Sequence, residues 1–148
     1  MISVRNIYKS YGIKNILSEV TIDFPEKKLT SLIGPNGAGK STLLMMMANL
    51  SQPDQGEILF NTQNIREIHL AEYAKNVATL RQTPGMNLRM TVKELIAFGR
   101  FPYSRGSLTS YDHHVIDEAI QFLDLDALSD SYLDELSGGQ RQMAFLAM

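Results

Sequence analysis

The chain has 148 residues, which fits one domain of ordinary size, and its 44% hydrophobic residues permit a packed core. The formal net charge of −2 gives no electrostatic case for a nucleic-acid partner, and we expect none. No cysteine is present, so disulfide frameworks and thiolate metal sites are excluded. The longest strongly apolar run, Leu43–Ala48, is far shorter than the roughly 20 residues that span a bilayer. We therefore expect any link to a membrane to depend on partner proteins.

The first third of the chain is predicted to form short strands followed by a helix. Loose alternation of apolar and polar residues at 2–7 and 20–24 predicts paired strands, and the mostly apolar segment 29–33 predicts a buried strand. The stretch 41–50 is rich in leucine and methionine and predicts a helix. Its run Met45–Met47 is interpreted as adaptable core packing, not as a metal site.

A glycine-rich turn joins the predicted strand 29–33 to the helix and matches the pattern G-x-x-x-x-G-K-[ST] in full. It consists of Gly34, Pro35, Asn36, Gly37, Ala38, Gly39, Lys40 and Ser41. Glycines let the backbone wrap its amides around phosphate oxygens, and the helix presents its positive end to the same anion. Lys40 is suited to the β- and γ-phosphates, the Ser41 hydroxyl to Mg²⁺, and Thr42 to the α-phosphate. The turn therefore predicts binding of ATP with Mg²⁺.

The rest of the chain changes from mixed structure to helix. A strand is predicted near 56–60, a helix at 69–75 and another strand at 77–80. The pattern Thr-Val-Lys-Glu at 91–94 is a capping box that opens a helix through Phe98. A further helix at 112–123 carries apolar residues on one face. The expected fold class is therefore α/β in the first half and mainly helical in the second.

A second possible anion site precedes the last predicted helix. Residues Leu136, Ser137, Gly138, Gly139 and Gln140 read Leu-Ser-Gly-Gly-Gln. The two glycines expose backbone amides at a helix N-terminus, and Ser137 adds a hydroxyl. Together with the phosphate loop, this segment resembles the signature motif of ABC-family ATPases.

The resemblance to ABC ATPases covers the whole chain and implies its architecture. The implied fold is a P-loop NTPase with an N-terminal antiparallel β subdomain and an inserted helical subdomain. Residues 1–81 would form the β subdomain and P-loop core, 82–136 the Q-loop and helical subdomain, and 137–148 the signature motif and the start of its helix. We expect this sequence to stop before the Walker B strand and to end within a helix.

The same resemblance implies further site residues and partners. Tyr11 matches the aromatic residue that stacks on adenine, and Gln82 matches the Q-loop glutamine that contacts Mg²⁺ and the attacking water. Two such subunits would pair head to tail, so that the phosphate loop of one and Ser137–Gln140 of the other enclose each ATP. Membrane permease subunits, and indirectly a substrate-binding protein, would be the other partners, at the cytoplasmic face of the membrane.

The general base of the family is expected beyond the signature motif. The pair Asp134-Glu135 is no substitute, because no apolar strand leads into it and it precedes the signature; we interpret it as solvated loop charge. His69, His113 and His114 do not replace the general base either, and His113 and His114 are interpreted as solvent-exposed residues at the polar start of a helix. We therefore expect the full-length protein to be a transport ATPase, whereas the 148-residue chain alone would bind ATP weakly, hydrolyse none and be poorly soluble.

A narrower resemblance concerns the transported substrate. Segments 29–44, 98–104 and 132–136 are similar to iron(III)–siderophore importers, in particular the petrobactin type. This is family likeness only, since no chemistry of these residues selects iron. Importers of heme, cobalamin or another metal chelate stay open, as does a regulatory module that binds ATP without hydrolysis. A soluble ABC ATPase acting on DNA or ribosomes is disfavoured by the compact, mildly acidic sequence.

Overall fold

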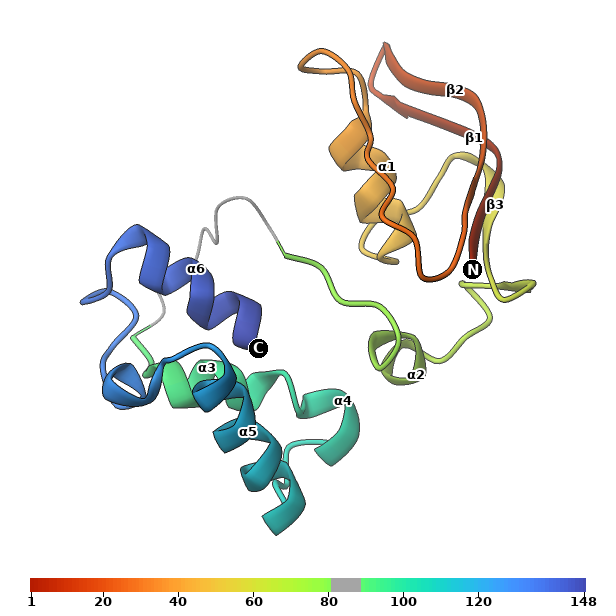
Figure 1. Ribbon diagram of the computed structural model, residues 1–148. Helices are drawn as coiled ribbons and strands as arrows, with labels where there is room; N and C mark the ends of the chain where they lie inside the picture. Colours follow the sequence, from red (N-terminus) through yellow and green to blue (C-terminus); the bar gives the residue numbers. More distant parts are fainter. Residues whose placement is uncertain (81–88) are drawn as a thin grey trace. The chain divides into compact units, whose positions relative to one another are not determined.

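The computed structural model describes residues 1–80 and 89–148, which divide into two compact units (Figure 1). The first unit, Met1–Ala78, contains the strands and the phosphate loop, and the second, Thr79–Met148, contains most of the helices. The three-segment division implied by the family resemblance stays a prediction.

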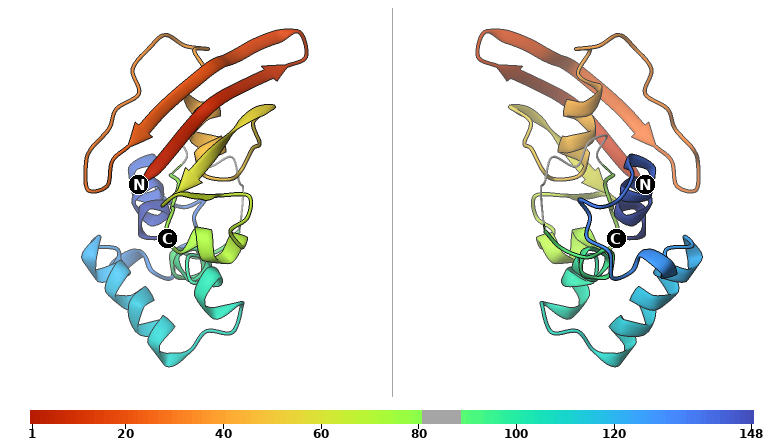
Figure 2. Two further views of the ribbon diagram at one scale, coloured as in Figure 1. Left: turned by 90° about the vertical axis from the view of Figure 1, so that its right-hand side faces the viewer. Right: turned by 90° about the vertical axis from the view of Figure 1, so that its left-hand side faces the viewer.

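An antiparallel sheet of four strands forms the framework of the first unit. Figure 2 shows its longer strands side by side. The strands are β1 (Ile2–Tyr11), β2 (Lys14–Phe24), β3 (Gln55–Phe60) and β4 (Gln63–Asn64), in the order β2-β1-β3-β4. In the β1–β2 hairpin, Tyr11 pairs with Lys14 across the turn, and Lys9 pairs with Leu17. The predicted strands at 2–7, 20–24 and 56–60 are confirmed.

Two helices pack their apolar side chains with those of this sheet. Helix α1 (Lys40–Met47) buries Met46 and Met47 in the same cluster as Val4, which confirms the core interpretation for these two methionines, whereas Met45 is half-buried. Helix α2 (Leu70–Ala74) buries Tyr73, whose hydroxyl donates to the backbone oxygen of Met47. The end of α1, the helix that follows the phosphate loop, is thereby tied to α2.

Two predicted strands, 29–33 and 77–80, are absent from the structure. Leu29 and Ile33 are 98% and 93% exposed, so the first segment is not buried either. An apolar run forms a buried strand only where neighbouring strands accept and donate its backbone hydrogen bonds. Among the described residues no strand pairs with either segment. Apolar composition alone was therefore an insufficient guide at these two places.

The second unit is a small helical assembly with its own core. Its helices are α3 (Val92–Phe98), α4 (Phe101–Ser104), α5 (Ser110–Phe122), the 3₁₀ turn η1 (Asp126–Leu128) and α6 (Gly138–Ala147). Val92, Ile96, Ile116, Leu133 and Ala144 bring α3, α5, α6 and the turn before α6 into one apolar cluster. The predicted helices and the capping box at Thr91 and Glu94 are confirmed.

Candidate nucleotide-binding site

The phosphate loop enters α1 through glycines in the left-handed region of backbone space. Gly37 has φ 81° and Gly39 has φ 83°, conformations that favour glycine because a Cβ would strain them. Gly39 occupies the N-cap of α1, and no side chain caps the helix there. The amide of Leu43 donates to the Gly39 oxygen at 2.9 Å, so the amides just before Leu43 have no acceptor within the helix. The start of α1 thus offers donors to an anion.

Gly39 is also the point where the loop lies against strand β2. A Cβ at this residue would come within 2.6 Å of Leu17 Cδ2 and 3.0 Å of the Ile16 backbone oxygen. Both distances are too short for ordinary contact, so the close approach depends on glycine. The loop therefore lies close to strand β2 of the β1–β2 hairpin at this residue.

Lys40 places its ammonium group within the turn of the loop. Its Nζ donates to the backbone oxygens of Gly34 and Pro35, each at 2.7 Å. The adjacent Ser41 is exposed and Thr42 is half-buried. An ammonium, hydroxyls and free amides together are the donor set that suits a polyphosphate, and a hydroxyl oxygen suits Mg²⁺. The residues present therefore fit the predicted ligands ATP and Mg²⁺.

Tyr11 ends strand β1 in the same unit as the loop. Its side chain is 54% exposed, and the Lys9 Nζ lies 5.4 Å from the ring centroid. The loop approaches Leu17, the residue that pairs with Lys9, so Tyr11 is only two residues along β1 from that contact. The structure therefore brings Tyr11 and the phosphate loop to the same part of the first unit.

The signature segment begins α6 in the second unit. The Ser137 hydroxyl accepts from the Gln140 amide at 3.3 Å, and the Gln140 side chain accepts from the Ser137 amide at 2.9 Å. This is a capping box, a role for Gln140 that the spacing Ser-x-x-Gln signals but that the motif comparison alone does not assign. Gly138 and Gly139 are exposed, and a Cβ added at either residue would have no neighbouring atom within 4 Å. Their role as an anion site stays a prediction.

The other candidate residues fall into two groups. Gln82 lies within 81–88, outside the described residues, so its predicted role is not tested. Asp134 and Glu135 lie in an exposed turn, where the Glu135 carboxylate accepts from the Tyr132 amide, as expected for loop charge.

Across residues 1–80 and 89–148, no three acidic or histidine side chains gather as a metal site, and no helix is long and apolar enough to cross a bilayer.

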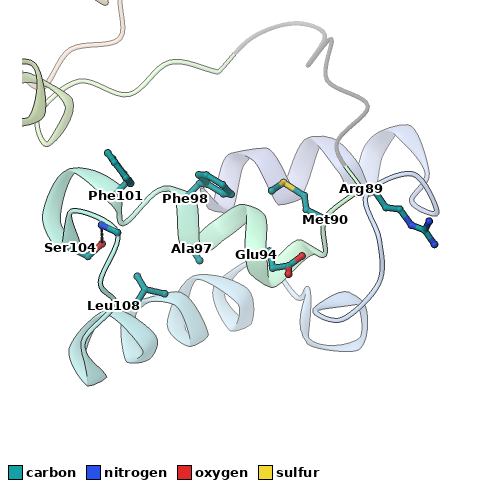
Figure 3. A pocket seen from close by; sticks show the side chains of 9 residues that line it. Arg89, Met90, Glu94, Ala97, Phe98, Phe101, Ser104 and Leu108 are labelled. Carbon is teal, nitrogen blue, oxygen red and sulfur yellow. Dashed lines mark hydrogen bonds between the residues drawn. The ribbon is translucent and has the colours of Figure 1, made fainter.

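A separate apolar hollow of about 460 Å³ lies within the second unit (Figure 3). It is lined by parts of α3, α4 and the loop that follows α4. Phe98 and Phe101 belong to its lining and are 59% and 61% exposed. Glu94 is the acidic residue among the lining side chains. The hollow lacks the glycine-rich backbone of the phosphate loop and is suited to apolar contacts.

Comparison with known proteins gives consistent matches. A model of the ABC transporter family matches residues 17–148. The petrobactin import ATP-binding protein YclP of Bacillus subtilis is 48% identical over 148 residues, and FatE of Bacillus anthracis, described in the same words, is 47% identical. Both alignments cover 100% of this chain and 59% of the relative. The chain therefore spans about 59% of the length of these curated relatives.

Solved structures agree with the sequence matches. A nucleotide-free ATP-binding cassette from an ABC transporter aligns with a TM-score of 0.78 at 28% identity, over 99% of this chain and 62% of that chain. An ATP binding subunit of an ABC transporter aligns with a TM-score of 0.82 at 23% identity, over 99% of this chain and 60% of that chain, which shows the fold alone. The expected α/β fold of an ABC ATPase is confirmed.

Proposed function

The chain belongs to the ABC transporter family, and on this premise we propose that it is the ATP-binding part of an importer subunit. The observation that carries the proposal is the phosphate loop, where left-handed glycines, the Lys40 ammonium and free amides meet at the start of α1. ATP with Mg²⁺ would be held by residues 34–42, with adenine stacked on Tyr11. Ser41 and Gln82 would hold Mg²⁺, which would supply positive charge beside the phosphates.

The imported substrate is proposed to be an iron(III)–siderophore complex of the petrobactin type. Support comes from the two Bacillus relatives, whose printed descriptions name petrobactin import and which match the whole of this chain. Hydrolysis of ATP by the whole protein would be coupled to this uptake.

Two kinds of partner are proposed. A second ATPase subunit would pair head to tail and present Ser137–Gln140 to the ATP bound at the phosphate loop of the first. The Ser137 oxygen accepts from an amide within its capping box, which leaves the hydroxyl proton free to donate. Membrane permease subunits would contact the apolar hollow, because Phe98 and Phe101 expose aromatic surface beside it. The protein would thus lie at the cytoplasmic face of the membrane.

The test is a chimera in Bacillus subtilis in which these 148 residues replace the matching stretch of YclP. We expect uptake of iron-loaded petrobactin to persist in the chimera and to be lost when Lys40→Ala is added. The Lys75→Met variant is the matched control, because it removes a lysine that forms an exposed ion pair with Glu72 on α2. A chimera that accumulates normally and binds ATP but supports no uptake of iron-loaded petrobactin contradicts the proposed role as the ATP-binding partner of a petrobactin-type importer.

A further inference from the structure

A polar group adjacent to Tyr11 has no part in the function proposed above. The Asp54 carboxylate, just before β3, accepts from Lys9 Nζ at 2.8 Å through Oδ1 and from the Ser10 amide at 2.7 Å through Oδ2. The Asp54 amide donates to the Tyr8 oxygen at 2.9 Å. Asp54 therefore contacts three successive residues of β1, directly before Tyr11.

Lys9 connects this carboxylate to the aromatic ring. Residues 9 and 11 lie two apart on β1, the spacing that places side chains on the same face of a strand. The Lys9 Nζ is 5.4 Å from the Tyr11 ring centroid, within cation–π range, and the Lys9 side chain is only 14% exposed. A lysine stem that is largely covered and an ammonium that is bonded to Asp54 give the cation a defined position beside the ring.

We propose that Lys9 and Asp54 are positioning residues that hold the Tyr11 ring in the orientation needed to stack on a purine base. The proposal rests on the nucleotide site proposed above and adds two residues to it. Asp54 holds Lys9 and the end of β1 through its bonds to the Lys9 ammonium and the Ser10 amide. Lys9 covers part of the Tyr11 ring, and more than half of Tyr11 stays exposed. The ring is thereby ordered before the base arrives, which lowers the entropy lost on binding.

The position of the phosphate loop supports this assignment. Gly39 contacts Leu17, and Leu17 pairs with Lys9 in the hairpin. Lys9 thus lies opposite the residue that the loop approaches, two residues before Tyr11 on β1. Its ammonium is bonded to Asp54 and lies over the Tyr11 ring, so we expect its removal to affect recognition of the base more than recognition of the phosphates.

The test separates base recognition from phosphate recognition. Dissociation constants of the 148-residue chain are measured by calorimetry for MgATP and for magnesium tripolyphosphate, which has no base. We expect Lys9→Met to weaken MgATP binding by about two- to fivefold and to leave tripolyphosphate binding unchanged. Lys9→Arg keeps the cation and should restore MgATP affinity, and the Lys75→Met control should change neither ligand. Asp54→Asn, which keeps the side-chain shape, should give a smaller loss for MgATP alone.

A second readout uses the absence of tryptophan from the chain. In a Tyr11→Trp background, MgATP should quench the single tryptophan, and Lys9→Met should reduce that quenching at saturation. Equal weakening of both ligands by Lys9→Met and by Asp54→Asn, or an unchanged ratio of the two affinities, overturns the positioning role. If the parent chain binds neither ligand, the nucleotide site itself is wrong and this inference fails with it.

Discussion

Two helices of this chain begin at glycine-rich segments, but their first turns are built in opposite ways. Helix α1 begins at Gly39, in a left-handed conformation and without a side-chain cap. Helix α6 begins at Ser137, in an extended conformation and with a complete capping box to Gln140. The first helix therefore leaves its opening amides to a ligand, whereas the second satisfies some of them with its own side chains.

This difference suggests a division of tasks between the two segments. A loop that wraps a phosphate gains stability from the ligand and needs glycines that no side chain could replace. The signature segment is proposed to meet a ligand held by another subunit, and its capping box orders the start of α6 without any ligand. The comparison leads to three predictions, given from the largest expected effect to the smallest, and a fourth prediction concerns the pH dependence of stability.

The largest effect is expected at Lys40. Lys40→Ala removes the ammonium that lies in the turn of the phosphate loop, so the dissociation constant for MgATP should rise by about 10- to 100-fold. The measurement is a calorimetric titration with the thermal midpoint as a control for folding. An affinity within twofold of the parent would place the phosphates elsewhere.

A comparison of glycines tests how much each helix start depends on backbone conformation. Gly39→Ala introduces a Cβ 2.6 Å from Leu17 Cδ2 at a φ of 83°, and should cost about 1–3 kcal/mol of unfolding free energy. The matched control is Gly138→Ala in α6, where a Cβ meets no atom within 4 Å and the change should stay within about 0.5 kcal/mol. Urea denaturation measures both. Equal costs at the two positions would remove the distinction between the helix starts.

The capping box of α6 should contribute to the stability of the second unit alone. Ser137→Ala removes the acceptor of the Gln140 amide and should cost about 1 kcal/mol, whereas Ser137→Thr keeps a hydroxyl and should cost less. Hydrogen exchange of α6 amides reports the change. MgATP affinity at the phosphate loop should not change, and a loss there would mean that Ser137 contributes to the site of its own chain.

The fourth prediction concerns the pH dependence of stability in acid. The Thr109 hydroxyl and amide, with Arg100, donate to the Asp112 carboxylate and lower its pKa from an ordinary value of 3.8 to about 2. Because the pKa is lower in the folded state, the unfolded chain takes up the proton first, and the stabilisation is present above about pH 4. It should be lost as the pH falls from about 4 to 2. Urea midpoints across this window should fall less in Asp112→Asn than in the parent, and identical slopes would contradict the assignment.

Local patterns in the sequence predicted the helices and the hairpin well. The capping box at Thr91 and the apolar face of α5 depend on residues within a few positions of one another, so spacing alone identifies them. The strand predictions for 29–33 and 77–80 were wrong because a strand depends on pairing with other strands, and the described residues supply no partner for either segment. The composition of a segment does not reveal whether such a partner is present.

The candidate site was only partly predictable for the same reason. The phosphate loop is one continuous motif, so its residues could be assigned from spacing. Asp54 lies 45 residues from Lys9, and only the pairing of β3 with β1 brings the two together. In contrast, the placement of Lys9 and Tyr11 on one face of β1 follows from the two-residue repeat of a strand.

The most direct test of the central claim is a titration of the ¹⁵N-labelled chain with MgATP, followed by amide chemical shifts. Because the start of α1 offers its amides to the phosphates, the largest shifts should fall within residues 34–42, followed by Tyr11. Amides at 137–140 of the same molecule should shift little, since that segment is proposed to meet the ATP of a partner subunit. Saturable binding with its largest shifts outside 34–42 would contradict the assignment of the phosphate loop.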